Sequence, residues 1–117
     1  MKVLYCSEGY TTHDRRFLTS LASAGCEVCF LQLTDRVYEL APLPAGITTS
    51  PWDPVPPSSL DWETCGGLAP GFRRVWDRER PDVALAGPIQ TGTLIAALSK
   101  CRPYVAMSWG SDLLVEA

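Results

Sequence analysis

The stretch KVLYCSEGYTTHDRRFLTSLASAGCEVCFLQL, residues 2–33, decides the fold. Residues 2–6 are mostly apolar, as is typical of a buried strand. Residues 13–24 repeat apolar side chains at helical spacing, with Thr12 or Asp14 as the expected N-cap and Gly25 as the expected end. Residues 27–33 form a second apolar run. We therefore predict a β-α-β unit with a right-handed crossover and parallel strands.

The alternation of strand and helix continues later in the chain. We expect strands at 82–86 and 104–109 and helices at 71–80, 90–100 and 112–117. Seven of the ten prolines lie within residues 42–70, which predicts irregular backbone there apart from a short edge strand at 47–49. The whole pattern predicts a single α/β domain over residues 1–117, a three-layer sandwich with a mostly parallel, Rossmann-like sheet.

The composition is that of an ordinary globular chain, with 46% hydrophobic and 20% charged residues and a net charge of −3. A chain this hydrophobic is not intrinsically disordered. The absence of a dense basic run argues against nucleic acid as a partner. No apolar run approaches the roughly 18–20 residues of a transmembrane segment. Five cysteines at irregular spacing suit a reducing compartment, so we expect a cytoplasmic protein.

Three common α/β functions are excluded by missing motifs. The loop after the first strand has only one glycine, so it lacks the Gly-x-Gly-x-x-Gly pattern of dinucleotide sites. No phosphate-loop motif occurs, and Glu8 lacks the second acid expected of a receiver domain. In sheets of this kind ligands bind outside the carboxyl ends of the strands. We therefore look for function in residues 7–13, 87–90 and 110–112.

His13 and Arg15 are candidates in the first of these loops. His13 is the only histidine, and the positive end of the predicted helix favours a neutral imidazole that accepts a proton or bonds a hydroxyl. A surface histidine without a role is the alternative. Arg15 and Arg16 occupy a first helical turn, where cations are disfavoured. They either meet an anionic ligand, pair with Glu8 or Asp14, or are simply solvated.

The later loops supply further candidates. Gly87 precedes a helix, so the amides of Gln90, Thr91 and Gly92 are positioned for a phosphate or a sugar hydroxyl; the alternative is a tight turn capped by Thr91. Trp109 either stacks on a sugar face or closes the core.

The Cys26–Cys29 pair matches Cys-x-x-Cys but is not expected to be a redox or zinc site. It lies on a predicted strand, where residues i and i+3 face opposite sides. No second Cys or His pair completes a tetrahedral zinc site. We expect buried structural thiols and no metal.

Several segments together resemble the N-terminal domain of family 4-type glycosyltransferases, the two-domain retaining enzymes of the GT-B fold. They follow the family's order and spacing within residues 1–33 and 80–117. The segments are Met1–Cys6, His13–Phe17, Gly25–Val28, Arg80–Val83, Ala86–Pro88 and Ser108–Asp112.

This resemblance implies a domain that binds a sugar acceptor and closes over a nucleotide-sugar held by a second domain. His13 then lies near the acceptor or the transferred sugar, as the catalytic candidate. The resemblance implies Gly9, Gly110, Ser111 and Asp112 as substrate-binding residues. Together with the candidates that their positions in the loops suggest, the predicted substrate-binding residues are Gly9, Arg15, Gly87, Gln90, Trp109, Gly110, Ser111 and Asp112. The nucleotide-sugar is a donor substrate, and no other cofactor is implied.

The chain also departs from the family. Leu85 stands where many members have histidine, and Cys26 replaces another histidine. The family's nucleotide-binding signature, two glutamates separated by seven residues, is absent. We therefore expect part of an enzyme that is inactive alone. A non-catalytic binding module (a homo-oligomer or the partner of a companion domain), a gene fragment and a nucleotide-sugar epimerase-like domain remain alternatives.

Overall fold

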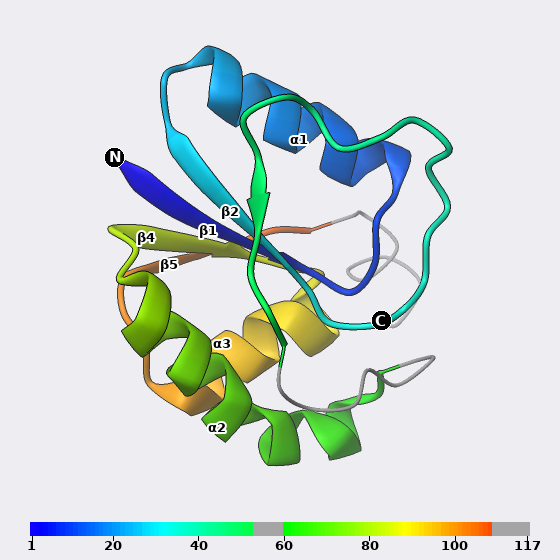
Figure 1. The fold of residues 1–117 in the computed structure, drawn as a ribbon. Helices are drawn as coiled ribbons and strands as arrows, with labels where there is room; N and C mark the ends of the chain where they lie inside the picture. Colours follow the sequence, from blue (N-terminus) through cyan, green and yellow to red (C-terminus); the bar gives the residue numbers. More distant parts are fainter. Residues whose placement is uncertain (53–59, 109–117) are drawn as a thin grey trace.

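The computed structural model describes residues 1–52 and 60–108 (Figure 1). Nine helices and strands occur in this part of the chain. In order they are β1 (Lys2–Ser7), α1 (Thr12–Ser23), β2 (Glu27–Gln32), β3 (Thr48–Thr49), α2 (Trp62–Glu79), β4 (Val83–Ala86), the π-helical turn η1 (Ile89–Thr93), α3 (Leu94–Ser99) and β5 (Tyr104–Ala106).

The five strands form one sheet in the order β3-β2-β1-β4-β5, and every neighbouring pair is parallel. Helix α1 covers one face, while α2, η1 and α3 cover the other (Figure 1). This arrangement is an α/β three-layer sandwich and confirms the predicted Rossmann-like sheet. The short edge strand expected within residues 47–49 is β3. In the described parts of the chain, no helix has the length and apolarity needed to cross a membrane.

The central strand β1 divides the core into two halves. Leu4 and Cys6 pack into the cluster under α2 and α3, whereas Tyr5 packs into the cluster under α1 with Leu18 and Phe30. All of these side chains are at most 2% exposed. Successive residues of a strand point to opposite faces, so an unbroken apolar run fits a strand covered on both sides.

Helix α1 has its N-cap one residue before Thr12 and three residues before Asp14, the two predicted caps. Thr11 is the N-cap: its side chain accepts from the Asp14 backbone N–H, and the Asp14 side chain accepts from the Thr11 backbone N–H. This reciprocal capping box satisfies two helix-end donors. The prediction of Thr12 or Asp14 as N-cap was therefore wrong. The helix ends, as expected, before Gly25, whose φ of +88° suits glycine.

The segment 42–70 was predicted to be irregular, but its last part belongs to helix α2. It starts at Trp62, with the Asp61 carboxylate accepting from the Thr64 amide at 2.9 Å, and it runs through Pro70. Cys65, Phe72 and Val75 are fully buried along one side of the helix. Burial of this face outweighs the roughly 3 kcal/mol cost of an internal proline. Pro70 itself is exposed.

The segment after β4 also differs from the sequence-based prediction. A continuous α-helix over 90–100 was expected, but the chain makes a π-helical turn before the six-residue α3. The Thr93 amide donates to the Pro88 carbonyl, five residues back, at 3.2 Å. β5 ends at Ala106 instead of Trp109. The helix predicted at 112–117 lies outside the described residues.

Candidate functional site

The candidate site lies where β1 and β4 end side by side. The Gly87 amide donates to the Cys6 carbonyl at 3.1 Å, which brings the two strand ends together. The chain leaves β1 toward α1 on one face and leaves β4 toward η1 and α3 on the other (Figure 1). Parallel sheets usually bind ligands in the crevice at such a reversal of direction, and we call this junction of the two loops the candidate crevice.

Gly9 follows β1 and Gly87 follows β4, and close packing within the fold requires a glycine at both positions. A Cβ on Gly9 would lie 2.6 Å from the Arg36 carbonyl oxygen. A Cβ on Gly87 would lie 2.8 Å from the Met107 carbonyl oxygen. The backbone passes too close for any side chain at either position.

His13 and Arg15 lie in the first turn of α1. His13 is exposed. Arg15 is half-buried, and its Nε donates to the Pro42 carbonyl at 3.4 Å. The oxygens of Asp14 accept instead from Tyr5 and Thr11. Arg15 therefore contacts the segment that follows β2, and of the alternatives given for it, pairing with Asp14 is not the one observed.

The start of η1 differs from both alternatives given for this turn. The Thr91 amide, one of the three considered for a phosphate or a sugar hydroxyl, donates to the Pro88 carbonyl at 3.2 Å. Thr91 is not the cap either, because Pro88 holds that position without a side-chain hydrogen bond. Gln90 is exposed at the same turn. Thr91 is 6% exposed, and its hydroxyl is buried with no hydrogen-bond partner among the described residues.

Glu8 is a further candidate that the sequence did not put forward as a site residue. Cys65 is fully buried beside Thr91, and its Sγ is 3.8 Å from the Thr91 carbonyl oxygen. Burial raises the pKa of Cys65, and the charges of Asp61 and Glu8 raise it further. Glu8 itself is half-buried in the loop that follows β1. The available sequence signal was its position directly after β1.

The Cys-x-x-Cys pair is split between the two faces of the sheet, as predicted. Cys29 is buried against the α2 side, whereas Cys26 packs on the α1 side and is only half-buried. The expectation that both thiols are buried was wrong for Cys26. All five cysteines are free. Within residues 1–52 and 60–108, no three His, Cys, Asp or Glu side chains cluster as metal ligands.

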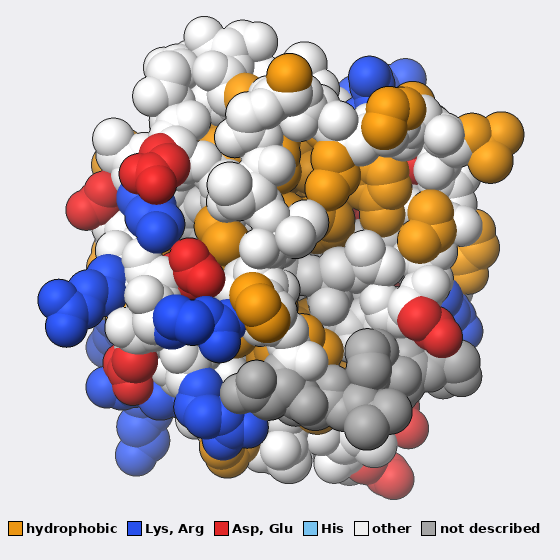
Figure 2. Space-filling view, viewed as in Figure 1, with side chains coloured by type: hydrophobic (Ala, Val, Ile, Leu, Met, Phe, Trp, Pro, Cys, Tyr) orange, Lys and Arg blue, Asp and Glu red, His pale blue; other side chains and the backbone are white. Residues whose placement is uncertain are grey.

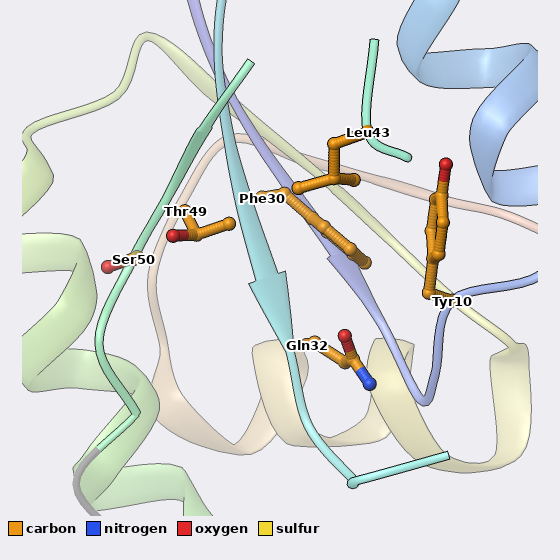
Figure 3. Close-up of a pocket in the computed structure, with 6 residues that line it drawn as sticks. All are labelled: Tyr10, Phe30, Gln32, Leu43, Thr49 and Ser50. Atoms are coloured by element: carbon orange, nitrogen blue, oxygen red, sulfur yellow. The ribbon is translucent and has the colours of Figure 1, made fainter. Parts of the chain in front are cut away.

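A separate pocket opens on the α1 side of β2 and β3 (Figure 3). Its volume is about 160 Å³, and its lining residues are Tyr10, Phe30, Gln32, Leu43, Thr49 and Ser50. No motif in the sequence marks this pocket, because its residues come from four separate segments of the chain. Their apolar and small polar types carry no motif.

The remaining predicted site residues, Trp109, Gly110, Ser111 and Asp112, lie outside the described residues. The comparisons with known proteins add no identification. No protein-family model, no curated protein and no solved structure matches this chain. The resemblance to family 4-type glycosyltransferases stays a prediction.

Proposed function

We propose that this chain is the acceptor-binding part of a glycosyltransferase that moves a sugar from a nucleotide-sugar to an acceptor. The observation that carries the proposal is the junction at which β1 and β4 end side by side, with the half-buried Glu8 directly after β1 and the buried, unpartnered Thr91 hydroxyl in η1 after β4. The resemblance supports it, since its segments supply β1, the start of α1 and the end of β4.

Sugar hydroxyls suit this crevice chemically. A carboxylate accepts hydrogen bonds from hydroxyl groups, and charge-assisted bonds of this kind are about twice as strong as neutral ones. A bound hydroxyl would also satisfy Thr91, which otherwise bears the cost of a buried polar group without a partner. His13, at the start of α1, is the proposed catalytic candidate facing the transferred sugar.

The second side of the site comes from a companion nucleotide-binding domain in this proposal. Stabilising a transition state requires groups around the reacting centre, and this chain supplies those of the acceptor side. We place the protein in the cytoplasm, because its five thiols are all free. Nucleic acid is not a proposed partner.

The test is a fusion of this chain to the nucleotide-binding domain of a retaining glycosyltransferase. The fusion is expected to transfer sugar, and the chain alone is not. Glu8→Gln should lower kcat/KM for the acceptor by about tenfold or more, the loss of one charge-assisted hydrogen bond. Glu27→Gln is the matched control, because this exposed acid lies at the opposite end of the sheet.

Two results would contradict the proposal. One is rapid turnover by the chain alone, which would show that no companion domain is needed. The other is equal kcat/KM for the Glu8 and Glu27 variants of an active fusion.

A non-catalytic binding module is the second candidate, and an exposed apolar segment favours it. Val37, Tyr38 and Leu40 are 60%, 66% and 102% exposed. Contiguous apolar surface of this kind often marks an interaction site. Light scattering distinguishes the candidates: a concentration-dependent oligomer that Leu40→Glu abolishes would favour the binding module.

A further inference from the structure

The pocket on the α1 side is distinct from the crevice between β1 and β4. It lies beside β2 and β3, and β2 is on the far side of β1 from β4. The segment after β2 closes it through Leu43 (Figure 3). A ligand in this pocket would therefore occupy a second position on the same domain.

Three side chains give the pocket apolar walls. Phe30 is 2% exposed and Tyr10 is 6% exposed, and their ring centroids are 6.0 Å apart. Leu43 lies above Phe30 in the view of Figure 3, with Tyr10 to one side. The Tyr10 hydroxyl donates to the Pro42 carbonyl at 3.1 Å, which fixes the ring. Rigid aromatic and aliphatic walls suit the C–H face of a ring.

Gln32 supplies an oriented hydrogen-bond acceptor. Its Nε2 donates to the Thr34 carbonyl at 2.8 Å and to the Arg36 carbonyl at 3.0 Å. Both amide hydrogens are therefore used, and no hydrogen bond to Oε1 is formed within the described residues. The oxygen points toward Phe30, while the nitrogen points away (Figure 3).

The other polar groups of the pocket are hydroxyls. The Ser50 hydroxyl is held by Glu79 and Arg78, at 3.0 and 2.6 Å. The Thr49 hydroxyl makes no hydrogen bond among the described residues, and Thr49 is exposed. No charged side chain lines the pocket. Figure 2 shows hydrophobic and uncharged side chains around the middle of this face, with Lys and Arg gathered to the left.

We propose that this pocket binds a neutral, hydroxylated ring of monosaccharide size. A ligand hydroxyl donates to Gln32 Oε1, another pairs with Thr49, and the ring carbons pack against Phe30, Tyr10 and Leu43. The volume of about 160 Å³ is well above the roughly 10–15 Å³ that a single water needs, so the pocket has room for a small ligand. A phosphate would lose its hydration without meeting a cation.

That this ring is part of the acceptor rests on the proposed function. That the pocket binds such a ring does not rest on it. The test is an NMR titration of the ¹⁵N-labelled chain with methyl α-D-glucopyranoside and methyl α-D-mannopyranoside. We expect shifts at the Gln32 side-chain amide and at the backbone of Leu43 and Thr49. A single ring of this size gives a dissociation constant on the order of 1–10 mM. Glucose 6-phosphate and adenosine monophosphate should bind more weakly.

Variants locate the binding. Leu43→Trp fills the pocket and should weaken glycoside binding at least tenfold. Leu40→Trp, on the same segment but fully exposed, is the matched control and should leave it unchanged. Thr49→Val removes an exposed hydroxyl without disturbing the core, and should weaken binding about two- to tenfold.

The inference is overturned if neither glycoside shifts these residues, if Leu43→Trp binds as the unaltered chain does, or if the anionic compounds bind more tightly. Failure of the proposed function is separate. If the chain binds the glycosides but the fusion transfers no sugar, the pocket is still a binding site. Only its role as part of the acceptor site is then contradicted. If the Leu43→Trp variant of the fusion transfers sugar with an unchanged KM for the acceptor, the pocket does not bind the acceptor during the reaction.

Discussion

The Tyr5 hydroxyl donates to Oδ1 of Asp14 at 2.8 Å, and both residues are completely buried. The second carboxylate oxygen accepts from the backbone N–H and the hydroxyl of Thr11, at 2.8 and 2.9 Å. One side chain thus ties β1, the following loop and α1 together. Burial raises the pKa of Tyr5, and the nearby Asp14 charge raises it further. This network positions the loop that carries Glu8.

Removing the tyrosine hydroxyl should destabilise the fold. Tyr5→Phe leaves a buried carboxyl group with one donor fewer, and hydrogen bonds to charged groups contribute about 1.5–3 kcal/mol. Urea denaturation should show a free energy of unfolding lower by about that amount. Tyr38→Phe, at a 66% exposed position, should change it by less than about 0.5 kcal/mol. If both variants changed the free energy of unfolding equally, the hydrogen bond from Tyr5 to Asp14 would not contribute to stability.

Gly92 should tolerate no side chain. An alanine Cβ there would lie 2.1 Å from the Gly87 carbonyl oxygen, so the η1 backbone would have to move. We expect Gly92→Ala to destabilise the chain by about 2–4 kcal/mol. Gly66→Ala in α2 is the matched control: no atom lies within 4 Å of its Cβ, and it should stabilise by about 0.5–1 kcal/mol. A harmless Gly92→Ala would contradict the close approach of η1 to β4.

Acid should weaken the attachment of β3 to α2 through Glu79. Burial alone would raise the pKa of Glu79, but hydrogen bonds from Ser50 and Arg78 and the charge of Lys2 outweigh it and hold the pKa below its ordinary 4.5. Because the folded-state pKa is depressed, this stabilisation is present above 4.5 and is lost as the pH falls through the folded-state value.

The measurement is urea denaturation at about pH 6.5 and about pH 3. Glu79→Gln should be less stable than the unaltered chain at the higher pH, and the difference should shrink at the lower pH. A constant difference would show that the Glu79 charge does not contribute.

The rate of alkylation should distinguish the buried thiols from the half-buried one. Burial raises the pKa of Cys6, with a further contribution from the Asp14 charge, and it is the leading cause of the raised pKa of Cys29 and Cys65. Since the thiolate is the reactive form, these three should react with iodoacetamide only as fast as the chain unfolds. The half-buried Cys26 should react first, as peptide mass spectrometry would show. Equal labelling of Cys26 and Cys29 would contradict the split across the sheet.

Local patterns predicted β1, α1 and β2 to within one residue at most boundaries. An apolar run bounded by Ser7 and Glu8 and a helical repeat ending at Gly25 are short-range signals that agree with the fold. The start of α2 was missed for the opposite reason. Its local prolines and glycines oppose a helix, and only the buried positions of Cys65 and Phe72 in the assembled core offset that cost.

The sequence by itself determined the α/β class and the carboxyl-end position of candidate loops, because strand period, helix period and chain order are local properties. Only the tertiary structure decided that Cys65 of α2 contacts Thr91 of η1, and that Phe30, Gln32 and Leu43 share a pocket. These groups are far apart in the chain. Crossovers of the parallel sheet bring them together, and no periodicity along the sequence encodes such a distance.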